Sequence, residues 1–319
     1  MDRLTLYIDK ENVKSFVQSK DKDLFDDCTR LIRKNIDIHY NFPKEDIAKD
    51  SYLQLWFRYV NGQGVSNNFE YSLCSEDIFP ERPFSLKDFG PEGNEDPFAI
   101  YLLDEKQSCN KIKNHNCILI GAVGQEITTI KQLLDINEEE EEFAIEVFKK
   151  GWEKYCPKLP LTDIVLCDNY YFSNYGVYER NNNNLIRVLS SRAKKFPINV
   201  VIITRNSEIS MDINIKDELD NIKDLVVEAS GNEDSSVTII GTRNAIHDRD
   251  LITNYYRIYS TAGFQRQQHV KNDIRFEIKS HTRGKNYNTS WKLIDNTYKN
   301  AIKTSPLCIG DKRSNFIDF

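Results

Sequence analysis

The chain has 319 residues, of which 39% are hydrophobic and 29% are charged, and its formal net charge is -6 at pH 7. That composition supplies a packed core and therefore excludes a disordered chain, a collagen-like fibre and a coiled-coil rod. The acidic balance disfavours a protein that coats nucleic acid without sequence preference.

The sequence shows no sign of export or of a membrane span. No apolar run approaches the roughly 18 residues that a membrane helix requires, and the first residues lack the basic and apolar regions of a secretory signal. The 7 cysteines are odd in number and no two form a C-x-x-C pair. We therefore expect reduced thiols, with neither a zinc site nor a disulfide framework, in a cytoplasmic protein without integral membrane association.

The first half of the chain alternates predicted strands and helices. We expect strands at 4–9, 36–40, 98–103 and 117–123, and helices at 21–36 and 44–59. Residues 61–97 are rich in Gly, Pro, Asn and Ser, which is typical of a long irregular excursion. Residues 128–155 are predicted to be helical, and the glutamates at 138–142 would favour the positive N-terminal end of a helix without any metal.

The second half is more regular. Apolar runs predict strands at 163–168, 198–204 and 237–241, and amphipathic patterns predict helices at 185–196 and 216–225. The asparagine run 181–184 is predicted to be a loop. Apolar strands that alternate with helices are typical of an α/β protein. We therefore predict an N-terminal α/β domain over 1–156 and a C-terminal α/β domain over 157–319 with a mostly parallel mixed sheet.

One short segment after the last of these strands carries chemistry. His247, Arg249 and Asn254 follow one another as a histidine, a basic residue and an amide. A histidine can attack phosphorus without a metal when a neighbouring cation holds the phosphate oxygens and an acidic residue orients the ring. Alternation along an extended segment places His247 and Arg249 on the same side, so the pattern fits metal-independent phosphodiester chemistry.

The segment resembles the motif of the phospholipase D superfamily, in which His-x-Lys is followed four residues later by Asp. Residues 247–253, HDRDLIT, are also similar to the phospholipase D-like domain at the C-terminus of MIT-domain proteins. The order of predicted elements over about 160–300 fits such a domain. In those proteins the fold is kept and the catalytic set is degenerate, so the resemblance implies that the domain binds a membrane or a partner.

This chain departs from the superfamily pattern in several ways. Arg249 replaces Lys and keeps the charge in a rigid fork, whereas Asn254 replaces Asp and removes the negative charge that would hold an imidazolium. The Gly-Ser-x-Asn that often follows the motif is absent. Active members also need two motifs. A second match, His281-x-Arg283 with Asn288, lies too close to the first to be a duplicated half, and we treat it as a coincidence.

Three interpretations of the segment stay open. The first is a structural network in which Arg249 pairs with Asp248 or Asp250 and His247 caps a loop. The second is a non-catalytic site for a partner protein, nucleic acid or lipid head group. The third is a phosphodiesterase, most readily a nuclease, in a homodimer that completes the site. The candidate catalytic residues are His247, Arg249 and Asn254, and the candidate binding residues are Arg243, Asp248 and Arg257.

Loss of the Asp charge favours the second interpretation, a phospholipase D-like scaffold with a degenerate His-x-Arg-x4-Asn motif. Stand-alone domains of this kind, joined to other modules, resemble parts of bacterial defence systems, so the resemblance implies an antiviral, anti-phage role. The alternative is the metal-independent nuclease with His247 as nucleophile. The sequence leaves open whether the protein is an enzyme, and we expect neither a cofactor nor a metal.

A weaker signal lies near the start of the chain. Asp9 and Asn12 follow the first predicted strand and are similar to the Asp and Asn that open PIN-like or NYN-like nucleases, where a carboxylate binds Mg²⁺. Such a site needs three or four carboxylates at strand ends, and Asp37, Asp104 and Glu126 are the other candidates. A turn with helix-capping residues explains the same pattern, and we favour that interpretation.

Two groups of aromatic residues offer surfaces on which nucleic-acid bases can stack. They are residues 170–172 and 255–256. Such side chains more often pack in the core or against loops, and we favour that interpretation for both groups.

Overall fold

The computed structural model describes residues 5–19, 22–35, 37–40, 42–61, 72–73, 99–103, 118–121, 130, 142–143, 161–190, 197–244, 246, 249–260, 275–281 and 284–319. Helices alternate with strands of parallel and mixed sheets, which confirms the predicted α/β class. The chain divides into two compact units, Met1–Asp135 with Thr282–Gly284 and Ile136–His281 with Lys285–Phe319. The predicted boundary after residue 156 lies outside the described residues.

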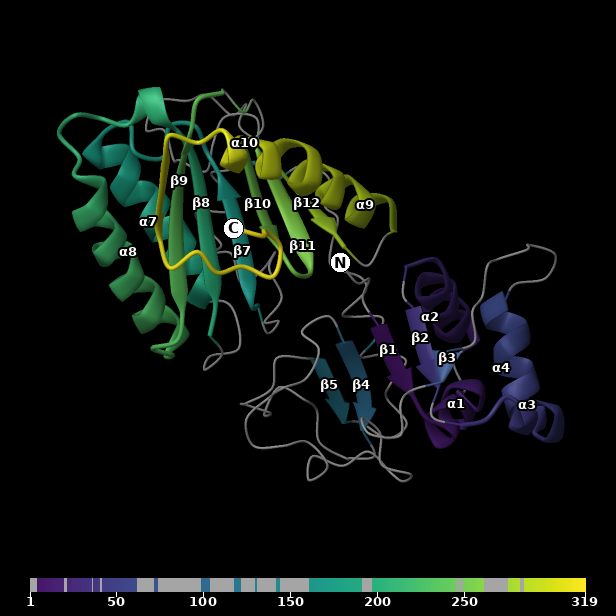
Figure 1. Ribbon diagram of the computed structural model, residues 1–319. Coiled ribbons are helices and arrows are strands. Elements are labelled where there is room, and N and C mark those ends of the chain that lie inside the picture. The colour runs from purple at the N-terminus through teal and green to yellow at the C-terminus, as the bar shows by residue number, and fades with distance from the viewer. Residues whose placement is uncertain are drawn as a thin grey trace. The chain divides into compact units, whose positions relative to one another are not determined.

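The first unit is built on a parallel sheet with the strand order β3-β2-β1-β4-β5 (Figure 1). Its strands are β1 (Thr5–Ile8), β2 (Asp37–Tyr40), β3 (Ser72–Leu73), β4 (Ala99–Leu103) and β5 (Ile118–Gly121). Its helices are α1 (Lys10–Val17), α2 (Lys22–Asn35), α3 (Glu45–Lys49) and α4 (Ser51–Asn61), and α1 and α2 both pack against α4. Since β2 and β4 lie on opposite sides of β1, the direction in which the sheet is built changes at β1.

Apolar side chains hold the helices of the first unit on its sheet. Leu6 and Ile8 of β1 are fully buried. The rings of Phe16 in α1 and Trp56 in α4 pack with their centroids 5.3 Å apart, and the Trp56 indole N–H donates to the Tyr40 hydroxyl at 3.0 Å. Buried aromatic rings contribute a large share of the hydrophobic stabilisation of a small core.

The second unit contains an eight-stranded mixed sheet in the order β13-β9-β8-β7-β10-β11-β12-β6. Three strands, β7 (Asp163–Cys167), β8 (Asn199–Arg205) and β9 (Ser236–Thr242), are parallel and are connected through α7 (Tyr175–Ser190) and α8 (Ile215–Ser230). The other strands are antiparallel: β6 (Glu142–Phe143), β10 (Arg249–Thr253), β11 (Tyr256–Ser260), β12 (Arg275–Ser280) and β13 (Leu307–Gly310). The remaining elements are the 3-10 turn η4 (Asn206–Glu208), α9 (Gly284–Leu293), the π-helical turn η5 (Ile294–Tyr298) and α10 (Lys299–Lys303).

The apolar runs of the sequence form the parallel strands, as predicted. Every residue of β7 and of β9 is buried, which is typical of parallel strands that are covered on both faces. The helices α7 and α8 pack side by side and lie next to the β9 end of the sheet (Figure 1).

The helix α7 starts earlier than predicted. It begins at Tyr175, whereas the sequence predicted a loop at 181–184 and a helix only from 185. The loop prediction is wrong because two of these asparagines turn inward: Asn181 and Asn182 are buried, and the Tyr171 hydroxyl donates to Asn182 Oδ1 at 2.7 Å. Polar partners in the core thus override the weak helix propensity of asparagine.

Glu142–Phe143 are also not helical. They form β6, in register with Phe276 and Arg275 of β12, so the helix predicted over 128–155 is wrong at this point. Pairing with a strand that is distant in sequence overrides the local pattern here. The rest of that helix, apart from the helical residue 130, lies outside the described residues, as do residues 61–97 apart from 61 and 72–73.

The C-terminal residues close the amino end of the parallel strands. Asp311 accepts the Val237 backbone N–H at 3.1 Å and pairs with Lys223 at 2.8 Å. Asn315 donates its backbone and side-chain N–H groups to Asp163 at 2.7 and 2.6 Å. Burial nevertheless raises the pKa of Asp163 to about 6, because desolvation outweighs these donors. Figure 1 shows this segment crossing β9, β8 and β7, so the chain itself occupies one end of the sheet.

At Gly310, the last residue of β13, the C-terminal segment lies very close to the backbone of β9. Gly310 has a φ of 106°, and an added Cβ would meet the Val237 carbonyl and lie 3.0 Å from Thr238 Cα. Gly231 at the end of α8 has a φ of 64° and nothing within 4 Å of the same position. We expect Gly231→Ala to lower the free energy of unfolding by about 1 kcal/mol and Gly310→Ala to lower it clearly more in urea titrations. Equal losses would show that the contact relaxes.

Candidate functional site

The carboxyl ends of β7, β8 and β9 and the start of the antiparallel β10 lie together, and we call this the carboxyl edge. Strand β8 follows β7 on one side, whereas β10 lies on the other side. The direction in which the sheet is built therefore reverses at β7. In open α/β sheets, ligands bind beyond the carboxyl ends of strands at such a reversal. We therefore expect a binding site at the carboxyl end of β7.

Asp168, directly after β7, is the central charge of the carboxyl edge. The residue is fully buried. Its Oδ1 accepts the Tyr170 backbone N–H at 2.9 Å and lies 3.8 Å from Arg249 Nε. Its Oδ2 has no hydrogen-bond partner within the described part of the chain. Burial raises the pKa of Asp168, although the Tyr170 N–H and Arg249 oppose the rise. A buried carboxylate with an unused oxygen is costly, so Asp168 marks a candidate functional position.

Arg249, the first residue of β10, connects this carboxylate to an exposed ring. Its guanidinium carbon lies 5.5 Å from the centroid of the Tyr170 ring, and Tyr170 is 39% exposed. Residues 171–172 and 255–256, the other members of the two aromatic groups, are buried, as the packing interpretation predicted. Of these five described aromatic residues, Tyr170 is therefore the one that reaches solvent, in an arrangement fixed by Asp168 and Arg249.

Asn169 fixes the loop that precedes the motif. Its Oδ1 accepts the Ile246 backbone N–H at 3.1 Å, and its Nδ2 donates to the Ile246 carbonyl. Its own carbonyl accepts the Thr204 hydroxyl at 3.0 Å and the Arg205 N–H at 3.3 Å. One residue thus links the end of β7 to the end of β8 and to the residue before His247.

The other sequence-predicted site residues are not all brought to this edge. Arg243 follows β9 and is exposed. His247 and Asp248 lie outside the described residues. Asn254 and Arg257 are largely buried, and their polar groups are used within the fold.

Asn254 lies at the opposite end of β10 from Arg249. The residue is 1% exposed. Its Oδ1 accepts the N–H groups of Thr162 and Asp163 at 3.1 and 3.4 Å, and its Nδ2 donates to the Thr162 hydroxyl at 2.8 Å. These bonds tie the β10–β11 turn to the start of β7. The structure therefore separates two of the three predicted catalytic residues by the length of a strand.

His281, the histidine of the second motif match, is part of the same structural junction. Its Nδ1 lies 3.2 Å from the Asn254 carbonyl and its Nε2 lies 2.9 Å from the Ser290 hydroxyl. Because a carbonyl only accepts, Nδ1–H donates to Asn254 and Nε2 accepts from Ser290. Burial lowers the pKa of His281 to about 4, and Arg257 acts in the same direction. The ring is thus neutral and serves the fold.

Arg257 forms an ion pair inside the second unit. Its Nε lies 2.5 Å from Asp250 Oδ1, and the hydroxyl of Tyr298 in η5 donates to Asp250 Oδ2 at 2.9 Å. Successive residues of a strand point to opposite faces. Asp250 accordingly faces Arg257, and Arg249 lies beside Asp168. The predicted pairing of Arg249 with Asp248 or Asp250 stays a prediction, because Asp248 lies outside the described residues.

The first unit has a second candidate position, at the carboxyl end of β1. Asp9 caps α1, and its Oδ1 accepts the Asn12 backbone N–H at 2.6 Å, as the capping interpretation predicted. The side-chain Oδ1 of Asn12 is buried and has no hydrogen-bond partner within the described ranges. This end of β1 corresponds topologically to the end of β7, since the order of strands reverses at both.

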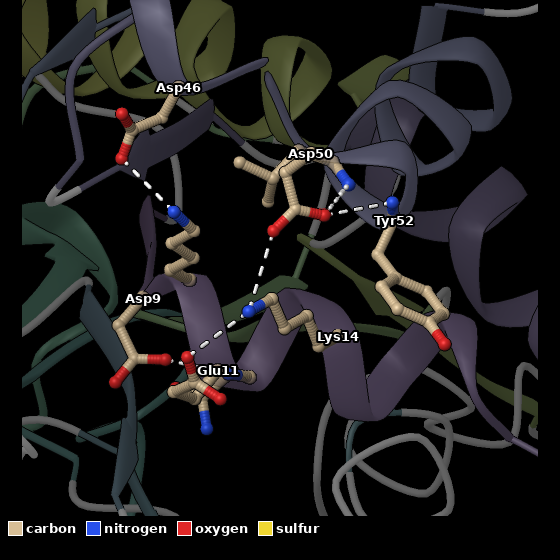
Figure 2. A network of polar contacts seen from close by, with 9 residues as sticks. Asp9, Glu11, Lys14, Asp46, Asp50 and Tyr52 are labelled. Carbon is tan, nitrogen blue, oxygen red and sulfur yellow. Dashed lines mark hydrogen bonds and ion pairs between the residues drawn. The ribbon is translucent and has the colours of Figure 1, made fainter. Parts of the chain in front are cut away.

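Lysines pair with the carboxylates around α1 (Figure 2). Lys10 pairs with Asp46 at 3.2 Å, and Lys14 lies 3.4 Å from both Glu11 and Asp50. These pairs tie α1 to the start and end of α3. Asp46 and Asp50 therefore hold α1 against α3, whereas Glu11 pairs within α1.

The residues that the structure describes contain no group of three His, Cys, Asp or Glu side chains suited to a metal ion. Of the further carboxylates predicted to accompany Asp9, Asp104, Glu126 and the side chain of Asp37 lie outside the described residues.

No protein-family model matches the chain, and no curated protein matches it. Within the described ranges, no helix is long and apolar enough to cross a membrane.

Asp168 and Asn169 belong to no motif, and sequence reasoning missed them. The signal that marks them is a pair of polar residues directly after an apolar strand in an α/β pattern. Their partners Arg249 and Ile246 come from a much later part of the chain, and only the strand order brings them together.

Because Arg257 pairs with Asp250 inside the second unit, a substitution of Asp250 should reduce the stability of the fold strongly. We expect Asp250→Asn to lower the free energy of unfolding by about 3 kcal/mol or more, because it removes the carboxylate charge that faces the largely buried Arg257 guanidinium. Asp295→Asn is the matched control: it breaks the more exposed pair with Lys299 at 3.0 Å and should cost at most about 1 kcal/mol. Urea unfolding measures both, and similar losses would contradict the structural role.

The buried His281 predicts a pH dependence of stability. Between the ordinary pKa of 6.5 and the folded value of about 4, the unfolded chain binds a proton that the folded protein does not. The neutral ring thus makes its full contribution to the free energy of unfolding above pH 6.5, and this contribution is lost as the pH falls toward 4. Relative to His281→Gln, the free energy of unfolding should fall by about 3 kcal/mol between pH 7 and pH 4.

Urea unfolding of both proteins across this pH range measures the difference. Asp163 titrates with a raised pKa and acts in the opposite sense, but both proteins retain it, so its effect cancels in the comparison. Parallel pH profiles would contradict the role of His281.

Proposed function

We propose that the second unit is a phospholipase D-like binding module that holds a partner at its carboxyl edge without cleaving it. One observation carries the proposal: Arg249 is the first residue of β10 and Asn254 directly follows that strand, so their Cα atoms lie about 16 Å apart. An amide at that distance, already bonded to Thr162 and Asp163, does not orient a histidine next to Arg249. The role that we propose for the whole chain is that of a non-catalytic component of a bacterial anti-phage system.

The phosphodiesterase alternative needs a different acid. Asp168 is a carboxylate beside Arg249, whereas Asn254 is an amide at the other end of β10, so in this alternative Asp168 would orient a nucleophilic His247. It would also need a second motif from another copy of the chain. A solution molar mass of a monomer would speak against this alternative.

A divalent-metal nuclease in the first unit is the second candidate function. It is favoured by the position of Asp9 where the order of strands reverses and by the unpartnered, buried Oδ1 of Asn12 beside it. An acidic residue and an amide oxygen are both ligands that Mg²⁺ accepts.

Cleavage assays separate these functions. We expect the protein to leave labelled single-stranded DNA, duplex DNA and RNA intact in EDTA, because Arg249 and Asn254 lie at opposite ends of β10. Cleavage that survives EDTA and is lost in His247→Ala would overturn the proposal in favour of the phosphodiesterase.

The same assay with Mg²⁺ tests the first unit. Cleavage that needs Mg²⁺ and is lost in Asp9→Asn, but not in the control Asp46→Asn, would establish the second candidate. Asp46 suits as the control because its carboxylate pairs with Lys10.

A further inference from the structure

Exposed apolar and aromatic side chains gather around the carboxyl edge of the second unit. Tyr170 lies in the loop after β7, Tyr175 starts α7, and Met211 lies in the loop before α8; all three are exposed. The two loops are joined, since the Ser210 backbone N–H donates to the Phe172 carbonyl at 2.9 Å. These side chains therefore belong to one surface, in contrast to the buried residues 171–172 between them.

Positive charge is available next to this surface. Arg243 is exposed and directly follows β9, whose carboxyl end lies at the same edge as those of β8 and β7. The carboxylates of Asp168 and Glu208 face Arg249 and Arg205 respectively. An exposed guanidinium beside carboxylates that have their own cations is a suitable partner for a phosphate.

The two helices that start at this edge differ in charge. The first turn of α7 has no acidic residue, and Asn174 caps it by accepting the Val177 N–H at 3.0 Å. The first turn of α8 contains Asp217 and Glu218. Acidic residues compensate the positive end of α8 but not that of α7, so an anion is favoured on the side of α7 and Tyr170.

We propose that the carboxyl edge binds single-stranded nucleic acid, with a base stacked on Tyr170 and the adjoining phosphates paired with Arg243 and the start of α7. This inference rests on the proposed binding function of the same edge and names its partner. Arg249 holds the Tyr170 ring in place from one side, so the ring is ordered before a base arrives and the association costs less entropy.

A single strand fits these observations better than a duplex or a membrane. Stacking on a protein ring requires an unpaired base. An anionic membrane surface covers a wider area and would also meet the acidic start of α8 together with Asp212, all on the Met211 side of the edge. The few cations here suit a short, weakly held strand, in line with the net charge of -6.

Binding of a labelled oligonucleotide of about 16 nucleotides, as DNA and as RNA, tests the proposal by fluorescence anisotropy in EDTA. Tyr170→Ala should weaken binding about tenfold, and Tyr170→Phe should bind like the unchanged protein because the ring is kept. The matched control is Tyr52→Ala in α4, which removes a tyrosine that is 40% exposed against 39% for Tyr170. It should leave the affinity unchanged.

The salt dependence of binding separates the two kinds of contact. Arg243→Ala should lower the slope of log affinity against log salt by about 0.7, the value for one phosphate contact on a single strand. Tyr170→Ala should weaken binding without changing that slope. Arg58→Ala, at an exposed arginine of α4, is the control for Arg243.

Three outcomes overturn the inference: no binding of either oligonucleotide, equal weakening by Tyr170→Ala and Tyr52→Ala, or a Tyr170-dependent binding of phosphatidylserine vesicles in place of oligonucleotides. The vesicle result would leave the proposed binding function standing with a different partner. Cleavage in EDTA that depends on His247 would instead defeat the non-catalytic function while Tyr170-dependent binding persisted, so the two failures are distinguishable.

Discussion

The position of β7 is the constraint on which the second unit depends. This strand has a parallel neighbour on one side and an antiparallel neighbour on the other. The end of β7 and the start of β10 are consequently adjacent, and Asp168 meets Arg249 there. A charge pair that would be screened at the surface is held at a buried carboxylate, where its interaction is stronger. The orientation of Tyr170 and the anchoring of Ile246 both follow from this meeting point.

The two ends of the parallel strands have different roles. At the amino end, Asp163 and Asn254 are satisfied by backbone and side-chain groups of the same chain, including Asn315. At the carboxyl end, one oxygen of Asp168 and the Nε of Arg205 are buried without a hydrogen-bond partner among the described residues. Buried polar groups are normally paired, so a ligand at the carboxyl end would find an acceptor on Asp168 and a donor on Arg205 to pair with.

The sequence predicted the parallel core because β7, β8 and β9 are runs of apolar residues whose burial is independent of their neighbours. It could not predict the role of Asn254, whose partners Thr162 and Asp163 are far away in sequence. The same limit applies to Glu142–Phe143, which form a strand only through pairing with β12. The local sequence pattern thus identifies strands that are apolar throughout. The contacts of the candidate site depend on the order of the strands in the sheet, which the local pattern does not give.

The π-helical turn η5 interrupts a helix that otherwise runs from Gly284 to Lys303. A π turn holds one residue more than an α turn, and from its end Tyr298 reaches Asp250. Removing one residue would restore regular α-helical geometry but would rotate everything beyond it by about 100°, and Tyr298 would leave the sheet. The number of residues in this helix is therefore restricted: relatives that keep the Asp250–Arg257 pair should keep Tyr298 and the length of η5, whereas its exposed residues should vary.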